Sequence, residues 1–315
     1  MSTPIEPPWD LYGAFLAVMQ TGSLSGASRA LRVAQPTVRR QIEALEDALG
    51  TALFTRAPNG LTPTEIAHAT LPHAEAIAAS ARALVRAASA PAEADRGTVR
   101  VTCSEIIGAE VLPAMLVRFR QAHPEIQIEL VLDNRNQDLL RREADVAIRM
   151  TPPTQAGLVR RRAGTIEIGL FASTAYLAKH PAPKTVAEAK RDHALIGPDR
   201  LRFALEVLAH IGLPATPKDF ALRTDSDLAQ LAAVRAGFGI GVCQVPIARG
   251  LERVLPQIRF PLEAWIVTHE DLKDVRRVRA VVDHLTTELG HYAQAETRAK
   301  SRQKRPKEAR GARVR

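Results

Sequence analysis

The stretch that decides the fold of the N-terminal region runs from Gly22 to Gly50 and reads GSLSGASRALRVAQPTVRRQIEALEDALG. Ser23 is well placed to cap one helix, and Pro36 lies in the first turn of the next, where its missing N–H costs little. The connection between the two helices, 32–34, is only three residues long. Apolar residues recur at helical spacing on both sides of it: Leu24, Ala27, Leu31, Val38, Ile42, Leu45 and Leu49. Two helices joined by so short a turn predict a helix-turn-helix.

The residues at the start of the second helix suit the reading of DNA, because in a helix-turn-helix this start enters the major groove. Gln35 can pair with an adenine edge, and Thr37 offers a hydroxyl and a methyl group. Arg39 and Arg40 can bind guanine or phosphate. An ordinary solvated helix face has the same composition, so the position within the motif carries the prediction.

The flanking sequence completes a small domain. Asp10 is a good N-cap for a first helix that would pack against the other two. The segments Leu53–Arg56 and Leu61–Thr64, with the turn Ala57–Gly60 between them, predict a two-stranded wing. Arg56 on this wing could reach a DNA phosphate beside the helix.

A long helix follows the wing. Thr62-Pro63-Thr64-Glu65 reads as a capping box with Thr62 as the cap, and the helical pattern continues to about Ser89. Such a helix spans roughly 40 Å, which is too long for one small core. Ile66, Ile77 and Leu84 form an apolar seam that favours a second copy of the same chain as partner.

Charge and composition limit the class of protein. The 315 residues contain 43 Lys and Arg against 34 Asp and Glu, a net charge of +9. The segment Glu296–Arg315 alone contributes nine basic and two acidic residues, so we expect a basic, disordered tail that either attracts phosphates or solubilises the chain. Neither a secretory signal nor a membrane span is predicted, and only two cysteines occur, which fits a reducing cytoplasm.

Strands and helices alternate between about Val99 and Tyr292. The predicted strands are Val99–Cys103, Ile126–Leu132, Asp145–Arg149, Ile166–Phe171, Phe220–Leu222, Gly239–Cys243 and Ala264–Thr268. The predicted helices are Ala109–Ala122, Gln137–Arg142, Thr174–Lys179, Thr185–Lys190, Leu201–Ile211, Ser226–Ala236 and Asp274–Tyr292. This succession implies a parallel sheet with helices on both faces, arranged as two α/β subdomains with a ligand cleft between them.

The segments Gly22–Leu31 and Gln35–Glu46 closely resemble the LysR-type transcriptional regulators, and the likeness continues through the wing. The α/β region looks like the effector domain of that family, notably at Ala144–Arg149 and Ala236–Gly241. The resemblance implies an α/β protein with an N-terminal winged helix-turn-helix and an effector region of two α/β subdomains resembling periplasmic binding proteins. We expect a DNA-binding domain at 9–62, a dimerisation helix at 63–90, an effector-binding domain at 97–292 and a basic tail at 293–315.

The resemblance further implies a cytoplasmic, sequence-specific regulator whose binding and bending of promoter DNA respond to a small-molecule inducer. Its expected partners are double-stranded DNA, a second copy or three further copies of the chain, and RNA polymerase. The expected DNA-binding residues are Ser23, Gln35, Pro36, Thr37, Arg39, Arg40 and Arg56. The expected effector-binding residues are Ser104, Asn134, Arg149, Thr224 and Asp225. Because Ser104 would start a helix, and helix N-termini attract anions, we expect a carboxylate as effector.

Three positions depart from the family pattern. Ala34 stands where Ser is usual and removes a helix cap worth about 1 kcal/mol. Arg32 lies in the turn, where a left-handed backbone would cost a residue with a Cβ about 1 kcal/mol. Arg39 replaces a typical Ser, which favours a different operator sequence.

Other functional classes fit less well. The sequence has no phosphate-binding glycine loop, no nucleophile elbow and no convincing set of metal ligands, so we expect neither an enzyme nor a metal site. The remaining alternative is a redox-sensing regulator that uses Cys103 and Cys243, each at the end of a predicted strand. Buried cysteines usually behave as small apolar residues, which weighs against this alternative.

Overall fold

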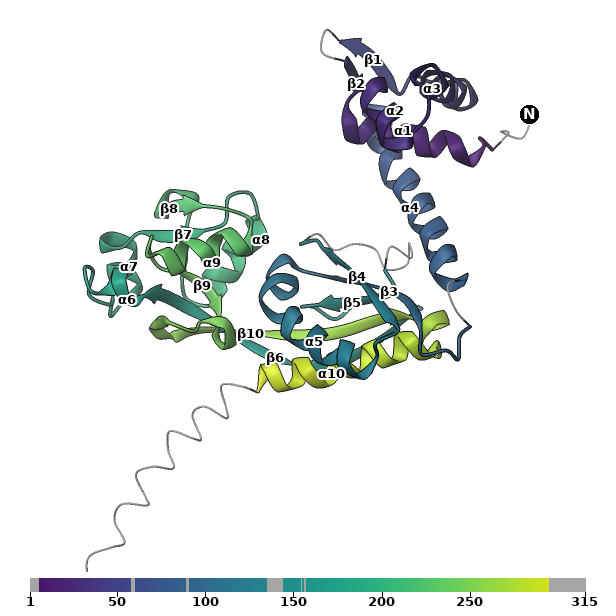
Figure 1. The fold of residues 1–315 in the computed structure, drawn as a ribbon. Coiled ribbons are helices and arrows are strands. Elements are labelled where there is room, and N and C mark those ends of the chain that lie inside the picture. Colours follow the sequence, from purple (N-terminus) through teal and green to yellow (C-terminus); the bar gives the residue numbers. More distant parts are fainter. Residues whose placement is uncertain are drawn as a thin grey trace, which may run out of the picture. The chain divides into compact units, whose positions relative to one another are not determined.

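The computed structural model describes residues 6–57, 60–88, 91–134, 144–153, 155 and 157–294 (Figure 1). The chain divides into two compact units, one ending at Ala88 and the other beginning at Ser89, and each has its own hydrophobic core. The predicted helix Gln137–Arg142, part of the wing turn and the basic tail beyond Gln294 lie outside the described residues.

The first unit is a winged helix-turn-helix followed by a long helix. Its elements are α1 (Trp9–Thr21), α2 (Leu24–Leu31), α3 (Gln35–Leu49), β1 (Phe54–Ala57), β2 (Gly60–Pro63) and α4 (Glu65–Ala88). The core consists mainly of Ala14, Phe15, Val18, Ala27, Val38, Ile42, Leu45 and Leu53. β1 and β2 pair antiparallel, with Arg56 opposite Leu61. The predicted motif and its wing are confirmed.

The first three helices of this unit end in residues with a left-handed backbone at the positions that the sequence indicates. Gly22 and Gly50, both at φ 67°, end α1 and α3. Ser23 caps α2, since its Oγ accepts a hydrogen bond from the Gly26 N–H at 3.0 Å. Arg32 ends α2 in a left-handed conformation at φ 56°, ψ 39°, which costs a residue with a Cβ about 1 kcal/mol.

Two predicted helix starts are wrong. Pro8 occupies the cap of α1, and Asp10 lies in the first turn, where its Oδ2 accepts a hydrogen bond from Gln41 Nε2 at 3.0 Å. α4 begins two residues later than the capping-box pattern predicts, because Thr62 and Pro63 are held extended in β2. Thr64 is the actual cap, since its Oγ1 accepts a hydrogen bond from the Ala67 N–H at 3.2 Å.

The predicted apolar faces are buried only in part. Leu31 is 37% exposed and Leu49 is 43% exposed, because each stands in the last turn of its helix, beyond the core. On α4, Ile66 is 44% exposed and Leu84 is 72% exposed. Val85, next to Leu84, is 70% exposed. Within the first unit, α4 therefore leaves an apolar face without cover.

The second unit is an α/β body. Its strands are β3 (Gly97–Cys103), β4 (Ile126–Leu132), β5 (Val146–Arg149), β6 (Leu158–Ser173), β7 (Leu195–Gly197), β8 (Phe220–Arg223), β9 (Gly241–Gln244) and β10 (Leu251–His269). Its α-helices are α5 (Leu112–Ala122), α6 (Thr174–Leu177), α7 (Val186–Asp192), α8 (Arg202–His210), α9 (Asp227–Ala236) and α10 (Arg276–Ala293). A π-helical segment, Ile107–Val111, leads into α5, and 3-10 turns occur at Pro217–Asp219, Val245–Ile247 and Glu270–Leu272.

The prediction of a parallel sheet is only partly correct. The main sheet has the order β4-β3-β5-β10-β6-β9, in which β3 is parallel to β4 and β5 while the contacts of β10 and β6 are antiparallel. β7 and β8 pair in parallel. The strands β6 and β10 are 16 and 19 residues long, far longer than predicted. Charged and proline residues interrupt their apolar pattern, as at Arg160–Arg162 and Pro261, so local sequence did not indicate their full length.

β6 and β10 run through both halves of the unit (Figure 1). We call the half around β3, β4, β5, α5 and α10 the first lobe, and the half around β7, β8, β9 and α6 to α9 the second lobe. One apolar cluster extends from Ile107 and Met115 in the first lobe to Leu231 and Cys243 in the second. A separate cluster that includes Tyr176, Leu208 and Phe220 fills the second lobe.

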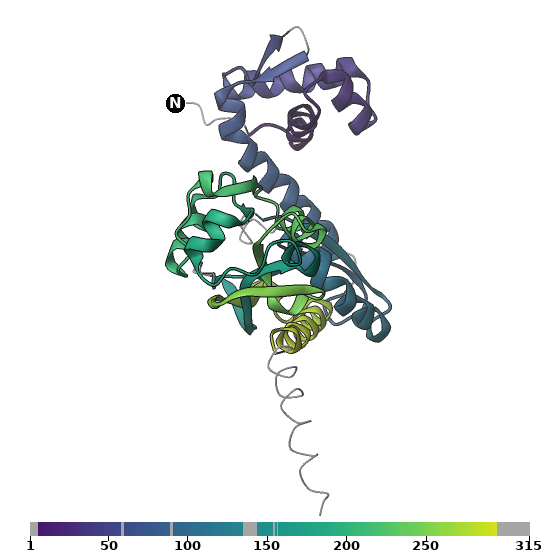
Figure 2. The ribbon, with the colours of Figure 1, turned by 90° about the vertical axis from the view of Figure 1, so that its left-hand side faces the viewer.

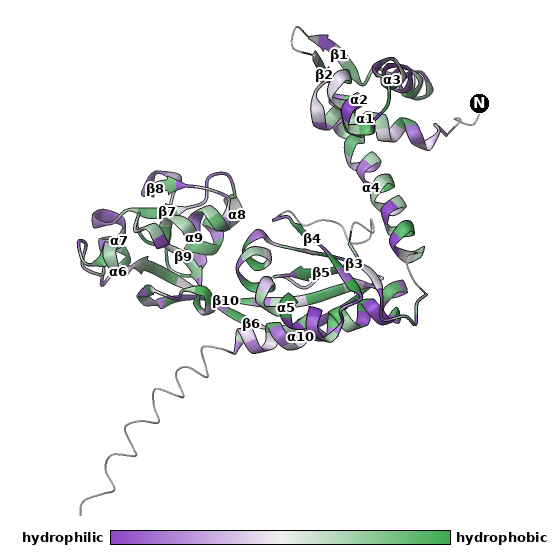
Figure 3. Ribbon diagram, in the orientation of Figure 1, coloured by the Kyte–Doolittle hydropathy of each residue, from purple (hydrophilic) through white to green (hydrophobic). Residues whose placement is uncertain are grey.

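α10 lies along one side of the main sheet (Figures 1 and 2). Val278, Val281 and Leu285 on its inner face are buried, and its outer face is largely hydrophilic (Figure 3). None of the helices among the described residues is long and apolar enough to span a membrane.

Candidate nucleic-acid interface and ligand pocket

The start of α3 presents most of the residues predicted to bind DNA. Gln35, Pro36, Arg39 and Arg40 are exposed, and Thr37 is half-buried. The helix orients them because Val38, Ile42 and Leu45 fix its other face in the core. Ala34 gives α3 no side-chain cap. The structure therefore brings five of the seven predicted residues onto one helical turn and a half.

Hydrogen bonds from backbone N–H groups attach the wing to the helix-turn-helix. Glu46 Oε1 on α3 accepts the N–H groups of Leu53 and Phe54 at 2.7 and 3.0 Å. On the other wing strand, the Leu61 N–H donates to the Gly22 carbonyl at 3.1 Å. Arg56 is exposed on β1, so it is held on the same rigid body as α3.

Ser23 has a different position from the other six. It is half-buried, and its Oγ is occupied by the Gly26 N–H at the start of α2. The observed contact makes it the helix cap of α2.

Five guanidinium groups on the helix-turn-helix and its wing are available for an anionic partner. Arg39, Arg40 and Arg56 are exposed and form no ion pair within the described part of the chain. The same is true of Arg29 and Arg32, which sequence reasoning did not select. Their position in the last turn of α2 and in the connection to α3 could have indicated them.

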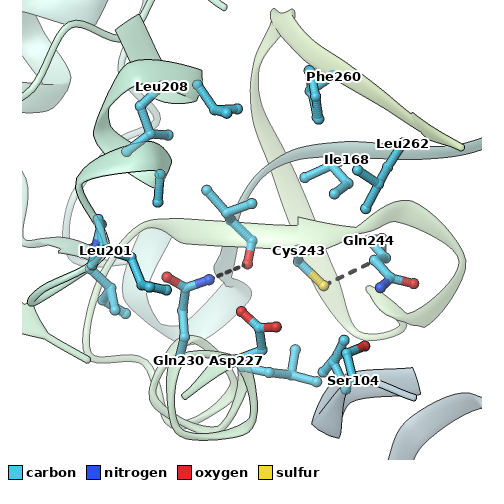
Figure 4. Close-up of a pocket in the computed structure, with 18 of the residues that line it drawn as sticks. Ser104, Ile168, Leu201, Leu208, Asp227, Gln230, Cys243, Gln244, Phe260 and Leu262 are labelled. Carbon is cyan, nitrogen blue, oxygen red and sulfur yellow. Dashed lines mark hydrogen bonds between the residues drawn. The ribbon is translucent and has the colours of Figure 1, made fainter. Parts of the chain in front are cut away.

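The second unit contains a cavity of about 350 Å³, lined from both lobes (Figure 4). This volume lies within the range of about 300–1,000 Å³ that is common for small-molecule sites. Most of its wall is apolar and includes Ile106, Ile168, Ile196, Leu208, Leu231, Val242, Phe260 and Leu262. Ser104, Thr224, Asp225, Asp227, Gln230 and Gln244 supply the polar part.

Three of the five predicted effector-binding residues line this cavity. Ser104, Thr224 and Asp225 do so, whereas Asn134 and Arg149 are absent from its described wall. Asn134 Oδ1 instead accepts the Glu105 N–H at 3.0 Å. Arg149 Nη1 donates to the Ile148 carbonyl at 3.1 Å.

Two of the three lining residues also organise the backbone. Thr224 Oγ1 accepts the Ser226 N–H at 3.1 Å. Asp225 Oδ1 accepts the N–H groups of Asp199 and Arg200 at 2.9 and 3.1 Å. Burial alone would raise the pKa of Asp225, but these backbone donors outweigh it and lower the pKa below its ordinary value. Asp225 is therefore a charged carboxylate whose oxygens already accept hydrogen bonds from the backbone.

Sequence reasoning missed three polar wall residues: Asp227 and Gln230 belong to α9, and Gln244 belongs to β9. Asp227 starts α9, and burial, together with the nearby negative charge of Glu105, raises its pKa. Gln230 Nε2 donates to the Val242 carbonyl at 3.0 Å, and Gln244 Oε1 accepts the Tyr292 hydroxyl at 2.7 Å. Asp225 was selected because it follows the end of a predicted strand. Asp227 lies only two residues further along, so the same reasoning could have included it.

The two cysteines are free and buried. Cys243 lines the cavity and its thiol donates to the Gln244 carbonyl at 3.3 Å, whereas Cys103 is not part of the described wall. Burial raises the pKa of each thiol to about 12. Because the thiolate is the reactive form, these pKa values disfavour the redox alternative. Among the described residues no group of His, Cys, Asp and Glu is arranged to hold a metal ion.

A winged helix-turn-helix combined with a two-lobed α/β body that encloses a cavity defines a class of DNA-binding protein. Residues 9–68 match the family described as "Bacterial regulatory helix-turn-helix protein, lysR family", and residues 92–290 match "LysR substrate binding domain". The chain therefore belongs to the LysR family of transcriptional regulators.

Individual relatives agree with this assignment. A probable HTH-type transcriptional regulator LtrA of Klebsiella pneumoniae is 24% identical over 86% of this chain and 92% of its own length. An HTH-type transcriptional regulator of Xanthomonas campestris is 30% identical over 54% of this chain, and a CrgA regulator of Neisseria meningitidis is 29% identical over 58%. The matches cover only about half and three fifths, 49% and 61%, of these two relatives.

The fold is also that of a solved structure, full-length CbnR complexed with target DNA. The TM-score is 0.63, with 20% identity over 88% of this chain and 98% of CbnR. At this level of identity the likeness concerns the fold alone.

Proposed function

We propose that this protein binds double-stranded DNA at specific promoter sequences and that a small molecule in the cavity of the second unit changes this binding. The observation that carries the proposal is the exposure of Gln35, Arg39 and Arg40 at the start of α3, together with that of Arg56 on the wing. The hydrogen bonds of Glu46 hold both surfaces in one body. A rigid helix start beside a cationic wing suits simultaneous contact with bases and phosphates.

The side chains divide by the chemistry they offer. Gln35, Thr37 and Arg39, together with Pro36, would face base edges, whose donor and acceptor pattern distinguishes base pairs in the major groove. Arg40 and Arg56 would pair with phosphates and fix the register on the duplex. Ser23 would hold the start of α2, and through it the angle between the helices.

A second copy of the chain would form a dimer that can contact two DNA half-sites. The exposed Ile66, Leu84 and Val85 on α4 provide an apolar face for a homodimer, and two dimers could form a homotetramer. A two-fold axis would place two α3 helices on neighbouring half-sites of one DNA face. We place this activity in the cytoplasm, with RNA polymerase as a further partner at the promoter.

The effector would act through the two lobes. A ligand that binds between the lobes favours the arrangement of the lobes that it contacts best. It can shift the equilibrium between two arrangements only to the extent that its affinities for them differ. We propose that this shift is transmitted to the bend of the bound promoter DNA. The ligand is a small organic molecule that needs no metal or other cofactor.

Footprinting on the promoter DNA upstream of the protein's own gene tests the proposal. The wild-type protein should protect two half-sites about one helical turn apart, or a multiple of this spacing. The double variant Gln35→Ala, Thr37→Ala should lose this pattern while it keeps weak, uniform binding. A wild-type protein that protects no defined sequence would contradict the proposed function.

A further inference from the structure

The polar end of the cavity is acidic. Asp225 and Asp227 both line it, and Glu105 follows the lining residue Ser104. Asp225 stays charged through its backbone donors. Glu105 is close enough to Asp227 for their negative charges to interact, and Glu105 Oε2 accepts the Ser226 hydroxyl at 3.0 Å. Two carboxylates of the second lobe therefore line this end of the cavity, and Glu105 of the first lobe lies next to the wall, close enough to act on one of them.

The described wall of the cavity contains neither Lys, Arg nor His. Outside the wall, the charge of Arg200 lowers the pKa of Asp225, and its guanidinium group pairs with Asp199 at 3.5 Å. Two further guanidinium groups have other partners. Arg235 forms a two-pronged pair with Glu110, at 2.9 and 2.7 Å. Arg149 donates to the Ile148 carbonyl, and its charge acts on the buried Cys103.

The helix N-termini at the cavity do not offset its negative charge either. Ser104 and Ser226 precede the two helical segments that begin there, and helix N-termini favour anions. Each of these segments, however, already carries a carboxylate in its first turn, Glu105 in one and Asp227 in the other. An incoming carboxylate would meet like charges at both ends that could otherwise attract it.

Unused hydrogen-bond acceptors point to the type of head group. Ser104 Oγ is buried and has no hydrogen-bond partner among the described residues. Gln230 uses its Nε2 on the Val242 carbonyl, which leaves its Oε1 as an acceptor at the cavity wall. In Figure 4 the carboxylate of Asp227 lies between Gln230 and Ser104 and faces the cavity. A donor-rich head group at this position could bind all three.

We propose that the effector of this protein is an organic cation, an amine with an apolar body, rather than the carboxylate expected from the sequence. This inference rests on the proposed effector function and names its ligand class. The ammonium group binds Asp227, with Ser104 and Gln230 as neutral acceptors. The apolar body fills the space between Ile168, Leu208 and the other aliphatic and aromatic side chains of the wall.

Calorimetry on the full chain with three probes of matched shape tests the ligand class. Phenethylamine, phenethyl alcohol and phenylacetate share an aromatic ring on a two-carbon chain and differ in the charge of the head group. We expect phenethylamine to bind about tenfold more tightly than the alcohol, because charge-assisted hydrogen bonds exceed neutral ones, and phenylacetate to bind most weakly. A stronger binding of phenylacetate, or no binding of phenethylamine, would overturn the inference.

Variants identify the group responsible. Asp227→Asn should remove the advantage of the amine over the alcohol and leave the affinity for the alcohol within about twofold. Asp192→Asn, which neutralises an exposed carboxylate outside the described wall, should change neither affinity. An amine preference that survives in Asp227→Asn overturns the assigned contact. Binding to promoter DNA without any probe is measured separately, so that a wrong ligand class is distinguished from a failed regulatory function.

Discussion

Arg235 on α9 donates two parallel hydrogen bonds to Glu110, with Nη1–Oε1 at 2.9 Å and Nη2–Oε2 at 2.7 Å. Glu110 belongs to the π-helical segment of the first lobe and Arg235 to the second lobe, so the pair joins the lobes beside the cavity. The hydrogen bond from Ser226 to Glu105 joins them a second time. A change in the angle between the lobes must break or re-form these contacts.

The first prediction concerns this pair. Glu110→Gln should lower the free energy of unfolding by about 0.5–1 kcal/mol at neutral pH, since the pair is partly exposed. The hydrogen bond from Arg235 lowers the pKa of Glu110 below its ordinary value of 4.5. The contribution of the ionised Glu110 to the free energy of unfolding is therefore complete above pH 4.5 and is lost as the pH falls through the lowered pKa. Denaturation curves of both proteins should converge in acid; a constant difference at every pH would refute this assignment.

The second prediction separates base reading from phosphate contact. Arg39→Ala should reduce the preference for the operator over scrambled DNA by about 1–3 kcal/mol. Arg56→Ala should weaken binding to both sequences equally and lower the salt dependence by about one phosphate contact. Arg120→Ala, which removes an exposed charge from α5, is the control for net charge. Salt titrations of binding check all three, and identical behaviour of Arg39→Ala and Arg56→Ala would show that the two roles are not separate.

The third prediction concerns the left-handed turn. Arg32→Gly should raise the free energy of unfolding by about 0.5–1 kcal/mol, because glycine adopts a φ of 56° without the Cβ penalty. Arg29→Gly makes the same exchange inside α2 and should lower it by about 1 kcal/mol. Urea denaturation of the two variants gives the sign of each change. A destabilised Arg32→Gly would mean that the arginine side chain contributes a contact outweighing the strain.

The fourth prediction follows from the raised pKa of Asp227. Its ordinary pKa is 3.8, and in the folded protein it binds its proton more tightly. The stability contribution of Asp227 therefore falls as the pH rises from 3.8 through the raised folded value. Because Asp227 is exposed to solvent, which screens its charge, Asp227→Asn should be only slightly more stable than the wild type at neutral pH, by at most about 1 °C in melting temperature, and the advantage should vanish in acid. Melting curves across this pH range would refute the assignment if the variant were less stable at neutral pH.

The fifth prediction concerns the cysteines. Since burial raises the pKa of Cys103 and Cys243 to about 12, both thiols should resist peroxide in the folded protein. Mass spectrometry after mild peroxide treatment should find them unmodified, with the unfolded chain as a reactive control. A disulfide between them, or a sulfenic acid at either, would restore the redox alternative.

Local sequence was sufficient for most of the first unit because its signals act within a few residues. The cap at Ser23, the glycine ends of α1 and α3 and the periodic side chains of α3 all lie within one or two helical turns of the groups they organise. The start of α4 was misplaced because pairing in β2, not the capping-box residues, decided the conformation of Pro63.

The second unit depends on contacts between distant residues. β10 runs antiparallel to both β5 and β6, and nothing near Trp265 in the sequence indicates that Arg149 and Arg162 are its neighbours. The position of residues at strand ends suggested that Asn134 and Arg149 line the cavity. Which strand ends face the cavity depends on contacts between distant residues, so the sequence did not show it. The charge of Glu105 next to Asp227 could not be predicted either, because the two residues come from different lobes.

The most direct test of the central claim is competition binding of the purified protein to the DNA upstream of its own gene. The measurement uses moderate ionic strength, where phosphate attraction alone is weak, and compares that segment with a scrambled duplex of the same composition. We expect the promoter segment to compete at least about a thousandfold better, as is common for specific DNA-binding proteins. Equal competition by both duplexes, with and without phenethylamine, would contradict the account.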